Sequence, residues 1–341
     1  MTTSERVESA IADRREIVNE AIDEQLPVQK PERLYSASRY LLDAGGKRLR
    51  PTILLLVAES ISDCDPASAD YRSFPTPANE RVDILSAAVS IEVIQSFTLI
   101  HDDIMDDDDL RRGVPSVHRE FDLETAILAG DTLYSKAFEY MLDTGAPAER
   151  SVDALDELAT TCTEICEGQA LDVDFENRTD VTTDEYLEMI EFKTAVLYAA
   201  AAAIPAILLG CDEETVEALH GYGLDIGRAF QIQDDLLDLT VPSEALGKQR
   251  GSDLIEGKRT VITLHARDQG IDPETLVSEN PTDEEILAAV DRLRDAGSID
   301  FAREMAQELV KSGKERLEVL PENEPRELLD EIADFLVERG Y

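Results

Sequence analysis

Two aspartate triplets of the form Asp-Asp-x-x-Asp dominate the chemistry that this sequence can perform. The six carboxylates are Asp102, Asp103 and Asp106, followed by Asp234, Asp235 and Asp238. Because residues i and i+4 share one face of a helix, each triplet gathers its carboxylates in one direction. Clustered like charges repel unless a cation lies between them. The triplets therefore predict sites for a hard divalent cation, and Mg²⁺ fits because it binds carboxylates, waters and substrate phosphates.

Cationic side chains near both triplets indicate a phosphate-bearing substrate. Arg111 and Arg112 follow the first triplet, and guanidinium groups bind phosphate oxygens in a fork. Their alternative role is to balance the aspartates of 102–109 by ion pairing. Lys47 and Arg50 form a second cationic cluster in the GGKRLRP turn, where helix capping is the alternative role. Three more lysines lie before and after the second triplet: Lys193, Lys248 and Lys258.

Helical periodicity runs through nearly the whole chain, and no convincing alternating strand is found, so the sequence predicts an all-α fold. Pro51 is expected to begin its helix, and Gly45 and Gly46 to end the preceding one. The turn-rich segment 63–80 is expected to be a surface loop. The predicted helices are 5–24, 32–43, 51–62, 81–107, 122–143, 148–177, 183–209, 213–240, 253–268, 283–295, 298–318 and 325–338.

The composition narrows the choice of partners. The 341 residues include 74 Asp and Glu against 32 Lys and Arg, a net charge of −42, which argues against nucleic-acid binding. Because the acidity is dispersed and 43% of the residues are hydrophobic, we expect a folded protein in a salt-rich cytoplasm that screens its self-repulsion. No apolar signal segment opens the sequence, which predicts a cytoplasmic location. The uncharged run 194–211 is mostly alanine, and Pro205 interrupts it, which favours a buried helix over a membrane span.

Several motifs in one order resemble those of the trans-isoprenyl diphosphate synthases, or polyprenyl synthetases. The resemblance covers about residues 30–340 and rests on GGKRLRP, LIHDDIMDDDDLRRGVPSVH, GQALD, FKT and FQIQDDLLDL followed by two GK pairs. It implies one all-α domain over 1–341, a helical bundle around a deep central cavity, and a homodimer. The run of four aspartates at 106–109 is longer than in many members, and no role is assigned to the extra Asp107, Asp108 and Asp109.

The resemblance also implies a role for individual residues. About two or three Mg²⁺ ions would be held by Asp102, Asp103 and Asp106 on one side and by Asp234 and Asp235 on the other, with Asp238 in support. Residues matching contacts to the allylic diphosphate are Arg111, Lys193, Gln231, Lys248 and Lys258, with Thr194 in the FKT motif. Residues matching the isopentenyl diphosphate site are Lys47, Arg50, Gln95 and Arg112. Gln169 and Asp172 match a polar pair that lines the cavity.

The activity so implied is Mg²⁺-dependent condensation of isopentenyl diphosphate with an allylic diphosphate. Phe97 lies five residues before Asp102, about 7.5 Å of helix rise, beside the small Thr98 and with Ile94 deeper. A lone aromatic at this place resembles the archaeal pattern for a C20 product, geranylgeranyl diphosphate. Farnesyl (C15) and geranylfarnesyl (C25) diphosphate stay open as alternatives. For Phe97 itself the alternative to a length gate is packing in the core.

Three other functions are less compatible with the sequence. A class I terpene synthase shares the first triplet but normally lacks the second one and has no isopentenyl diphosphate site. A non-catalytic regulatory subunit of a prenyl synthase typically loses one triplet, whereas both are kept here. An acidic scaffold or cation buffer would not need lysines placed beside the triplets.

Overall fold

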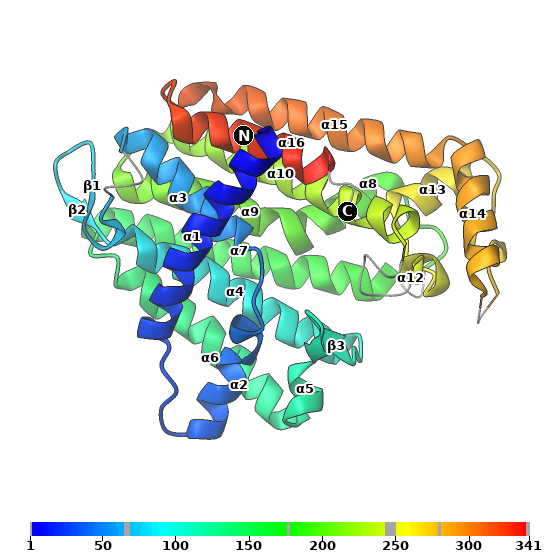
Figure 1. Cartoon of the computed structure of the whole chain (residues 1–341), viewed down its shortest axis with the longest axis horizontal. Coiled ribbons are helices and arrows are strands. Elements are labelled where there is room, and N and C mark those ends of the chain that lie inside the picture. The colour runs from blue at the N-terminus through cyan, green and yellow to red at the C-terminus, as the bar shows by residue number, and fades with distance from the viewer. Residues whose placement is uncertain (1, 65–68, 176–177, 243–249, 279–280, 339–341) are drawn as a thin grey trace. The chain divides into compact units, whose positions relative to one another are not determined.

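The computed structural model describes residues 2–64, 69–175, 178–242, 250–278 and 281–338. Helices make up nearly all of its regular structure (Figure 1), which confirms the all-α prediction. The first seven are α1 (Thr3–Gln25), α2 (Glu32–Asp43), α3 (Leu49–Ser62), α4 (Ile84–Met105), α5 (Val117–Glu120), α6 (Leu123–Leu142) and α7 (Ala148–Phe175). The others are α8 (Thr183–Ile190), α9 (Val196–Leu209), α10 (Glu213–Thr240), α12 (Ser252–Ile255), α13 (Val261–Asp268), α14 (Asp283–Asp295), α15 (Ser298–Arg316) and α16 (Glu324–Glu338).

The chain forms two compact units. Unit 1 comprises 1–162, 200–220 and 319–331, and unit 2 comprises 163–199, 221–318 and 332–341. The first aspartate triplet therefore belongs to unit 1 and the second to unit 2. The single domain and its central cavity stay predictions.

Unit 1 is built around α4, which packs against α3 and α6 (Figure 1). Asp83 caps the start of α4, because its side chain accepts a hydrogen bond from the Ser86 amide at 2.9 Å. The helix is then buried at every residue from Ile84 to Ile94. A helix that is apolar all round is a core helix, and α4 carries the first triplet at the opposite end of this buried stretch.

Unit 2 has its own core, formed where α13 contacts α8, α14 and α15 (Figure 1). Large apolar side chains of several helices fill it, among them Met189, Leu236, Leu264 and Ile299. The second triplet lies on α10, whose Ile232 and Leu236 point into this core. Because Ile232 and Leu236 are buried, the carboxylates on the same side of α10, Asp235 and Asp238, are buried too.

Two helical runs are long and apolar enough to cross a membrane, Ile84–Met105 and Thr183–Leu209. Of their most apolar windows, 72% and 78% respectively are buried inside the protein. Buried core helices have this composition too, so the absence of a membrane span stays a prediction.

Four expectations from the sequence were wrong in detail. The region 253–268 is two helices, α12 and α13, because Gly257 between them adopts a φ of +74°. Pro51 lies at the third position of α3, still within the first turn, where a missing N–H costs no helical hydrogen bond.

The remaining two errors concern extended and loop structure. Two-residue strands do occur: β1 (Phe74–Pro75) pairs antiparallel with β2 (Arg81–Val82), and β3 (Leu110–Arg111) pairs antiparallel with β4 (Val114–Pro115). Segment 63–80 is not wholly a surface loop, since Tyr71 and Phe74 are buried and stacked with ring centroids 5.8 Å apart.

Candidate active site

The first aspartate triplet lies at the C-terminus of α4, as predicted. Asp103 is fully buried, Asp102 is partly buried, and Asp106, the residue that caps the helix end, is exposed. Carboxylates at this end of a helix are disfavoured by the helix dipole. The triplet is therefore held in place by the fold in spite of its electrostatic cost.

A tight hairpin brings Arg111 back onto the triplet. The turn between β3 and β4 consists of Arg112 and Gly113, whose φ values of 55° and 77° are typical of a two-residue hairpin. Arg111 Nη2 then lies 2.5 Å from Asp103 Oδ1, 3.0 Å from Asp108 Oδ2 and 3.9 Å from Asp102 Oδ2. Arg111 thus acts as an internal counter-ion for this acidic cluster.

Asp103 keeps acceptor capacity in spite of that ion pair. Burial raises the pKa of its carboxyl to about 6, although Arg111 opposes the shift. Its Oδ2 is buried and accepts no hydrogen bond from any residue that the structure describes. A buried carboxylate oxygen of this kind is a hard donor suited to Mg²⁺. No three carboxylates, histidines or cysteines of the described part converge to hold an ion by themselves, so waters and substrate phosphates would complete the ligand set.

The extra aspartates have ion-pair partners that the sequence did not reveal. Asp107 Oδ1 lies 2.7 Å from Arg119 Nη2, and Asp109 Oδ1 lies 2.8 Å from Arg119 Nε. Asp108 pairs with Arg111. These contacts stabilise the loop between α4 and α5, which gives the three residues a structural role.

The second cationic cluster of unit 1 forms between the GGKRLRP turn and Arg112. Arg112 Nη1 donates hydrogen bonds to the carbonyls of Leu41, at 2.8 Å, and of Gly45. Burial lowers the pKa of Arg112, and the nearby positive charge of Arg50 adds to this effect. The predicted isopentenyl diphosphate residues Arg50 and Arg112 are thus brought together, while Lys47, in the same turn, is exposed.

In unit 2 the second triplet has a buried member at the same position as the first. Asp235 is buried and Asp234 is exposed. Asp235 Oδ2 accepts a hydrogen bond of 2.5 Å from Tyr186 Oη, and Oδ1 accepts one of 3.1 Å from Gln231 Nε2. Burial raises the pKa of Asp235, and the neighbouring charge of Asp253 raises it further. Tyr186 was missed because nothing in its local sequence marks it as a partner of a residue 49 positions away.

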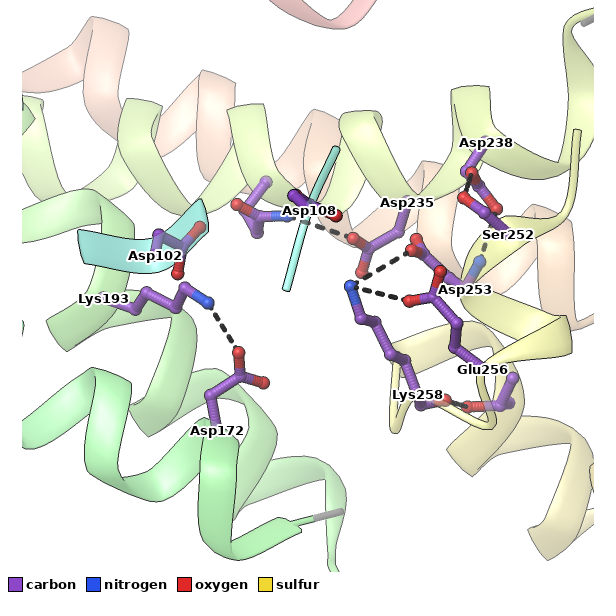
Figure 2. Close-up of polar contacts among 12 residues, drawn as sticks. Asp102, Asp108, Asp172, Lys193, Asp235, Asp238, Ser252, Asp253, Glu256 and Lys258 are labelled. Carbon is purple, nitrogen blue, oxygen red and sulfur yellow. Dashed lines mark hydrogen bonds and ion pairs between the residues drawn. The ribbon is translucent and has the colours of Figure 1, made fainter. Parts of the chain in front are cut away.

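Asp238 serves as an anchor for the next turn. Its Oδ1 accepts a hydrogen bond from Ser252 Oγ at 2.7 Å, and its Oδ2 accepts one from the Asp253 amide at 3.2 Å (Figure 2). Lys258 points between Asp253 and Glu256, with its Nζ 3.8 Å and 3.2 Å from their carboxylates (Figure 2). Metal binding by Asp238 stays a prediction, and Lys248 lies outside the described residues.

Lys193 stands on a π-helix, Glu191–Ala195, inserted between α8 and α9. Such single-turn insertions are frequent at functional sites. Lys193 Nζ lies 2.5 Å from Asp172 Oδ2 on α7 (Figure 2), and Thr194 Oγ1 donates to Gln231 Oε1 at 3.0 Å. The sequence motifs FKT, GQALD and QDD are thereby joined in one network of unit 2.

Gly168 makes that network possible. A Cβ at this position would lie 2.6 Å from the Phe192 carbonyl carbon and 2.7 Å from Lys193 Cα, so α7 meets the π-helix at backbone distance. Gln169, the next residue, has a buried Nε2 without a hydrogen-bond partner in the described part of the chain. Gly223 and Gly227 on α10 approach Ala199 and Ala195 in the same manner, as expected for close helix packing.

The predicted chain-length residues lie on α4 ahead of the first triplet. Phe97 is half-buried, and its ring centroid lies 4.9 Å from that of His101 and 5.3 Å from that of Tyr134 on α6. Ile94 is fully buried. Thr98 Oγ1 donates to the carbonyl of Gln95 at 2.9 Å, within the same helix. An aromatic cluster therefore stands beside the first triplet within unit 1.

Comparison with known proteins finds similarity along the whole chain. The family described as polyprenyl synthetase matches residues 31–293. The chain is 84% identical over 341 residues to the geranylfarnesyl diphosphate synthase of Natronomonas pharaonis, with 100% of both chains covered.

Solved structures show the same fold. The geranylgeranyl pyrophosphate synthetase of Geoglobus acetivorans superposes with a TM-score of 0.87 at 46% identity, covering 96% of this chain and 99% of that one. A geranylgeranyl pyrophosphate synthase from Corynebacterium glutamicum, solved with isoprenyl diphosphate and magnesium, gives a TM-score of 0.80 at 28% identity, covering 98% and 99%.

Proposed function

The chain belongs to the polyprenyl synthetase family and is a prenyltransferase, and from that premise we propose that it condenses isopentenyl diphosphate with allylic diphosphates to make a short-chain all-trans prenyl diphosphate. The observation that carries this proposal is that unit 1 brings Asp103 together with the cationic residues Arg111 and Arg112. Asp103 is buried, and its Oδ2 has no hydrogen-bond partner among the described residues. Such a pairing suits a substrate that brings both a cation and phosphate oxygens.

The side chains contribute to the reaction by stabilising charge. The allylic carbon–oxygen bond breaks and releases diphosphate, the double bond of isopentenyl diphosphate attacks the allylic cation, and a proton is then lost to the released diphosphate. Arg111 in unit 1 and Lys193 in unit 2 would each bind diphosphate oxygens, whose charge grows as the carbon–oxygen bond breaks. Asp102, Asp103, Asp106, Asp234 and Asp235 would hold Mg²⁺, which when bound polarises the phosphate oxygens as a Lewis acid.

The proposed product is geranylfarnesyl diphosphate, C25. The support is the 84% identity over the full chain to a geranylfarnesyl diphosphate synthase. The second candidate is geranylgeranyl diphosphate, C20, which the bulky Phe97 beside Tyr134 favours. Incubation of the purified protein with Mg²⁺, isopentenyl diphosphate and labelled farnesyl or geranylgeranyl diphosphate distinguishes them by product chain length. A protein that leaves labelled dimethylallyl diphosphate unchanged as well as these two substrates would refute the proposed function.

We further propose a homodimer in a salt-rich cytoplasm. Large apolar side chains are exposed along α6: Leu123, Ile127, Leu128, Tyr134 and Leu142. Exposed apolar residues concentrated on one element are typical of a subunit interface. The charge of −42 favours a salt-rich medium, since salt screens the repulsion among the carboxylates. Light scattering gives the molar mass at high and low salt, and so tests whether the protein is a dimer and whether the dimer depends on salt.

Arg50→Ala should weaken isopentenyl diphosphate binding and leave the allylic substrate nearly unaffected. Arg50 lies near Arg112 and belongs to the turn that matches the isopentenyl site. Loss of a charged hydrogen bond to phosphate costs about 1.5–3 kcal/mol, which corresponds to about a tenfold or larger rise in KM. Initial rates with each substrate varied in turn measure the effect. If the allylic KM rises instead, the two sites are assigned the wrong way round.

Phe97→Ala should lengthen the product by at least one C5 unit. Removing the ring opens space beside Tyr134, along the helix that leads away from Asp102. Since Phe97 is only half-buried, the loss of stability should be smaller than the about 3–5 kcal/mol of a fully buried phenylalanine. Chromatography of the dephosphorylated products gives their length. Phe138→Ala, which removes another ring packed on Tyr134, is the matched control and should leave the length unchanged.

A further inference from the structure

Glu92 is a buried carboxylate on α4 that no motif of the sequence pointed to. Only 4% of its side chain is exposed. It lies in the stretch of α4 that is otherwise packed with apolar and small residues. An ionised group in such surroundings is costly unless it is paired and hydrogen-bonded, so its partners explain why it is there.

Two arginines converge on the same oxygen of Glu92. Arg48 Nη1 donates to Glu92 Oε1 at 2.6 Å, and Arg112 Nη2 lies 3.9 Å from that oxygen. Both guanidinium groups also bind carbonyls at the end of α2. Arg48 donates to Leu42 O at 2.6 Å and Arg112 to Leu41 O at 2.8 Å. Glu92 therefore lies within ion-pair distance of both arginines, and the Gly45 carbonyl accepts a hydrogen bond from each of them, so the end of α2 and the β3–β4 turn are joined at this point.

The backbone of both arginines is held in an unusual conformation. Arg48 and Arg112 have φ values of 53° and 55°, in the left-handed region that non-glycine residues rarely adopt. Gly46 touches the Arg112 guanidinium, since a Cβ there would lie 2.9 Å from Arg112 Cζ. At Arg112 the two-residue hairpin turn requires this φ, and at Arg48 the side chain is held by hydrogen bonds to Glu92 and to the Leu42 carbonyl.

The charge balance also depends on Glu92. Arg48, Arg50 and Arg111 all repel the positive charge of Arg112, and Glu92 is the carboxylate that counteracts them. Removing one partner of a buried ion pair leaves the other charge uncompensated. Without Glu92, the repulsion between the positive charges of Arg48 and Arg112 should drive their guanidinium groups apart and toward solvent.

We propose that Glu92 is a positioning residue for the isopentenyl diphosphate site. It fixes the Arg112 guanidinium and, through Arg48, the turn 45–48 that carries Lys47 and leads into Arg50. Glu92 does not itself contact the diphosphate, which its negative charge would repel. This inference rests on the proposed function, because it assigns a support to one of the two substrate sites proposed there.

The test is Glu92→Gln, which keeps the size and one acceptor oxygen but removes the charge. The KM for isopentenyl diphosphate should rise at least about tenfold, while the KM for the allylic diphosphate stays within about twofold. Calorimetric titration with isopentenyl diphosphate alone should show the same loss of affinity. An unchanged isopentenyl KM and affinity, or an equal rise in both KM values, would overturn the assignment.

A second buried pair in the same unit supplies the matched control. Glu59 is fully buried on α3 and binds Arg14 Nε at 2.9 Å and Tyr71 Oη at 2.7 Å. Glu59→Gln should lower the melting temperature without changing the ratio of the two KM values. If it shifts that ratio as Glu92→Gln does, the effect is loss of stability and the inference is wrong.

A second variant and measurements on the wild-type protein show whether a failure concerns the role of Glu92 or the proposed function. If Glu92→Gln does not fold, the double variant Arg48→Gln/Glu92→Gln leaves no unpaired charge from that pair, and it should show the same selective loss. A wild-type protein that binds isopentenyl diphosphate but forms no product would refute the proposed function, while the titrations still decide the role of Glu92. A wild-type protein that does neither would refute both.

Discussion

Replacing Asp103 by alanine should reduce prenyl transfer by at least about 10²-fold, the scale seen when one preorganised charge-stabilising group is lost. Asp103 is the fully buried member of the first triplet, and its Oδ2 has no hydrogen-bond partner in the described structure. The variant removes both that oxygen and the nearest of the three aspartates that pair with Arg111, at 2.5 Å. Folding should survive, because Arg111 keeps Asp108 as an ion-pair partner at 3.0 Å and one of several mutually repelling carboxylates is removed.

Turnover at saturating substrates measures this effect, and circular dichroism verifies the fold. Asp107→Ala is the matched control, since Asp107 is an exposed aspartate of the same run whose partner is Arg119. It should keep near-normal turnover. Near-normal turnover of Asp103→Ala would show that Asp103 is not a metal ligand.

The pH dependence of metal binding gives an independent check on Asp103. Burial raises the pKa of this carboxyl to about 6. Below that pH the group carries a proton that Mg²⁺ must displace, so the apparent Mg²⁺ affinity should fall as the pH drops through about 6. For the metal-free protein the sign is the opposite: a raised carboxyl pKa stabilises the fold at low pH, and this contribution is lost as the pH rises through about 6. Asp103→Asn should remove both dependences.

Gly168→Ala should have a large structural effect on the network around Lys193. The new Cβ would lie 2.6 Å from the Phe192 carbonyl carbon and 2.7 Å from Lys193 Cα, which are backbone atoms that cannot rotate away. Overpacking of this kind costs about 1–3 kcal/mol. The displaced π-helix should also carry Lys193 away from Asp172, so turnover should fall together with the melting temperature.

Gly221→Ala is the matched control for the same substitution in the same unit. Its Cβ would meet the end of the Arg316 side chain, with Nη1 at 2.6 Å, and that side chain is flexible enough to move. Alanine is favoured over glycine inside a helix by about 0.5–1 kcal/mol, so this variant should be neutral or slightly stabilised. Gly168→Ala with wild-type melting temperature and turnover would show that α7 can shift without disturbing Lys193.

Much of this protein can be predicted from local sequence alone. Helices α2, α10 and α14 begin and end at the predicted residues, because their periodic apolar positions and terminal residues lie within the segment itself. The first triplet was correctly placed at a helix C-terminus for the same reason. The motifs also indicated the family, since their order along the chain is a property of the sequence.

The tertiary structure alone decided which partner each charged residue takes. The sequence marked Arg111 and Arg112 as a pair, but the hairpin turns Arg111 onto Asp103 and Arg112 onto the carbonyls of Leu41 and Gly45. A left-handed φ at Arg112, which the two-residue turn between β3 and β4 requires, produces this split.

The burial of individual polar side chains and the close approach of helices could likewise not be predicted from the sequence. Tyr186 donates a hydrogen bond to Asp235, which is 49 residues away in the sequence. The π-helix that positions Lys193 packs directly against Gly168 of another helix. Helical periodicity and capping act over three or four neighbouring residues, so a sequence displays them directly. Ion pairing, desolvation and backbone contact act between residues that are distant in the chain, and these interactions arise only when the helices pack.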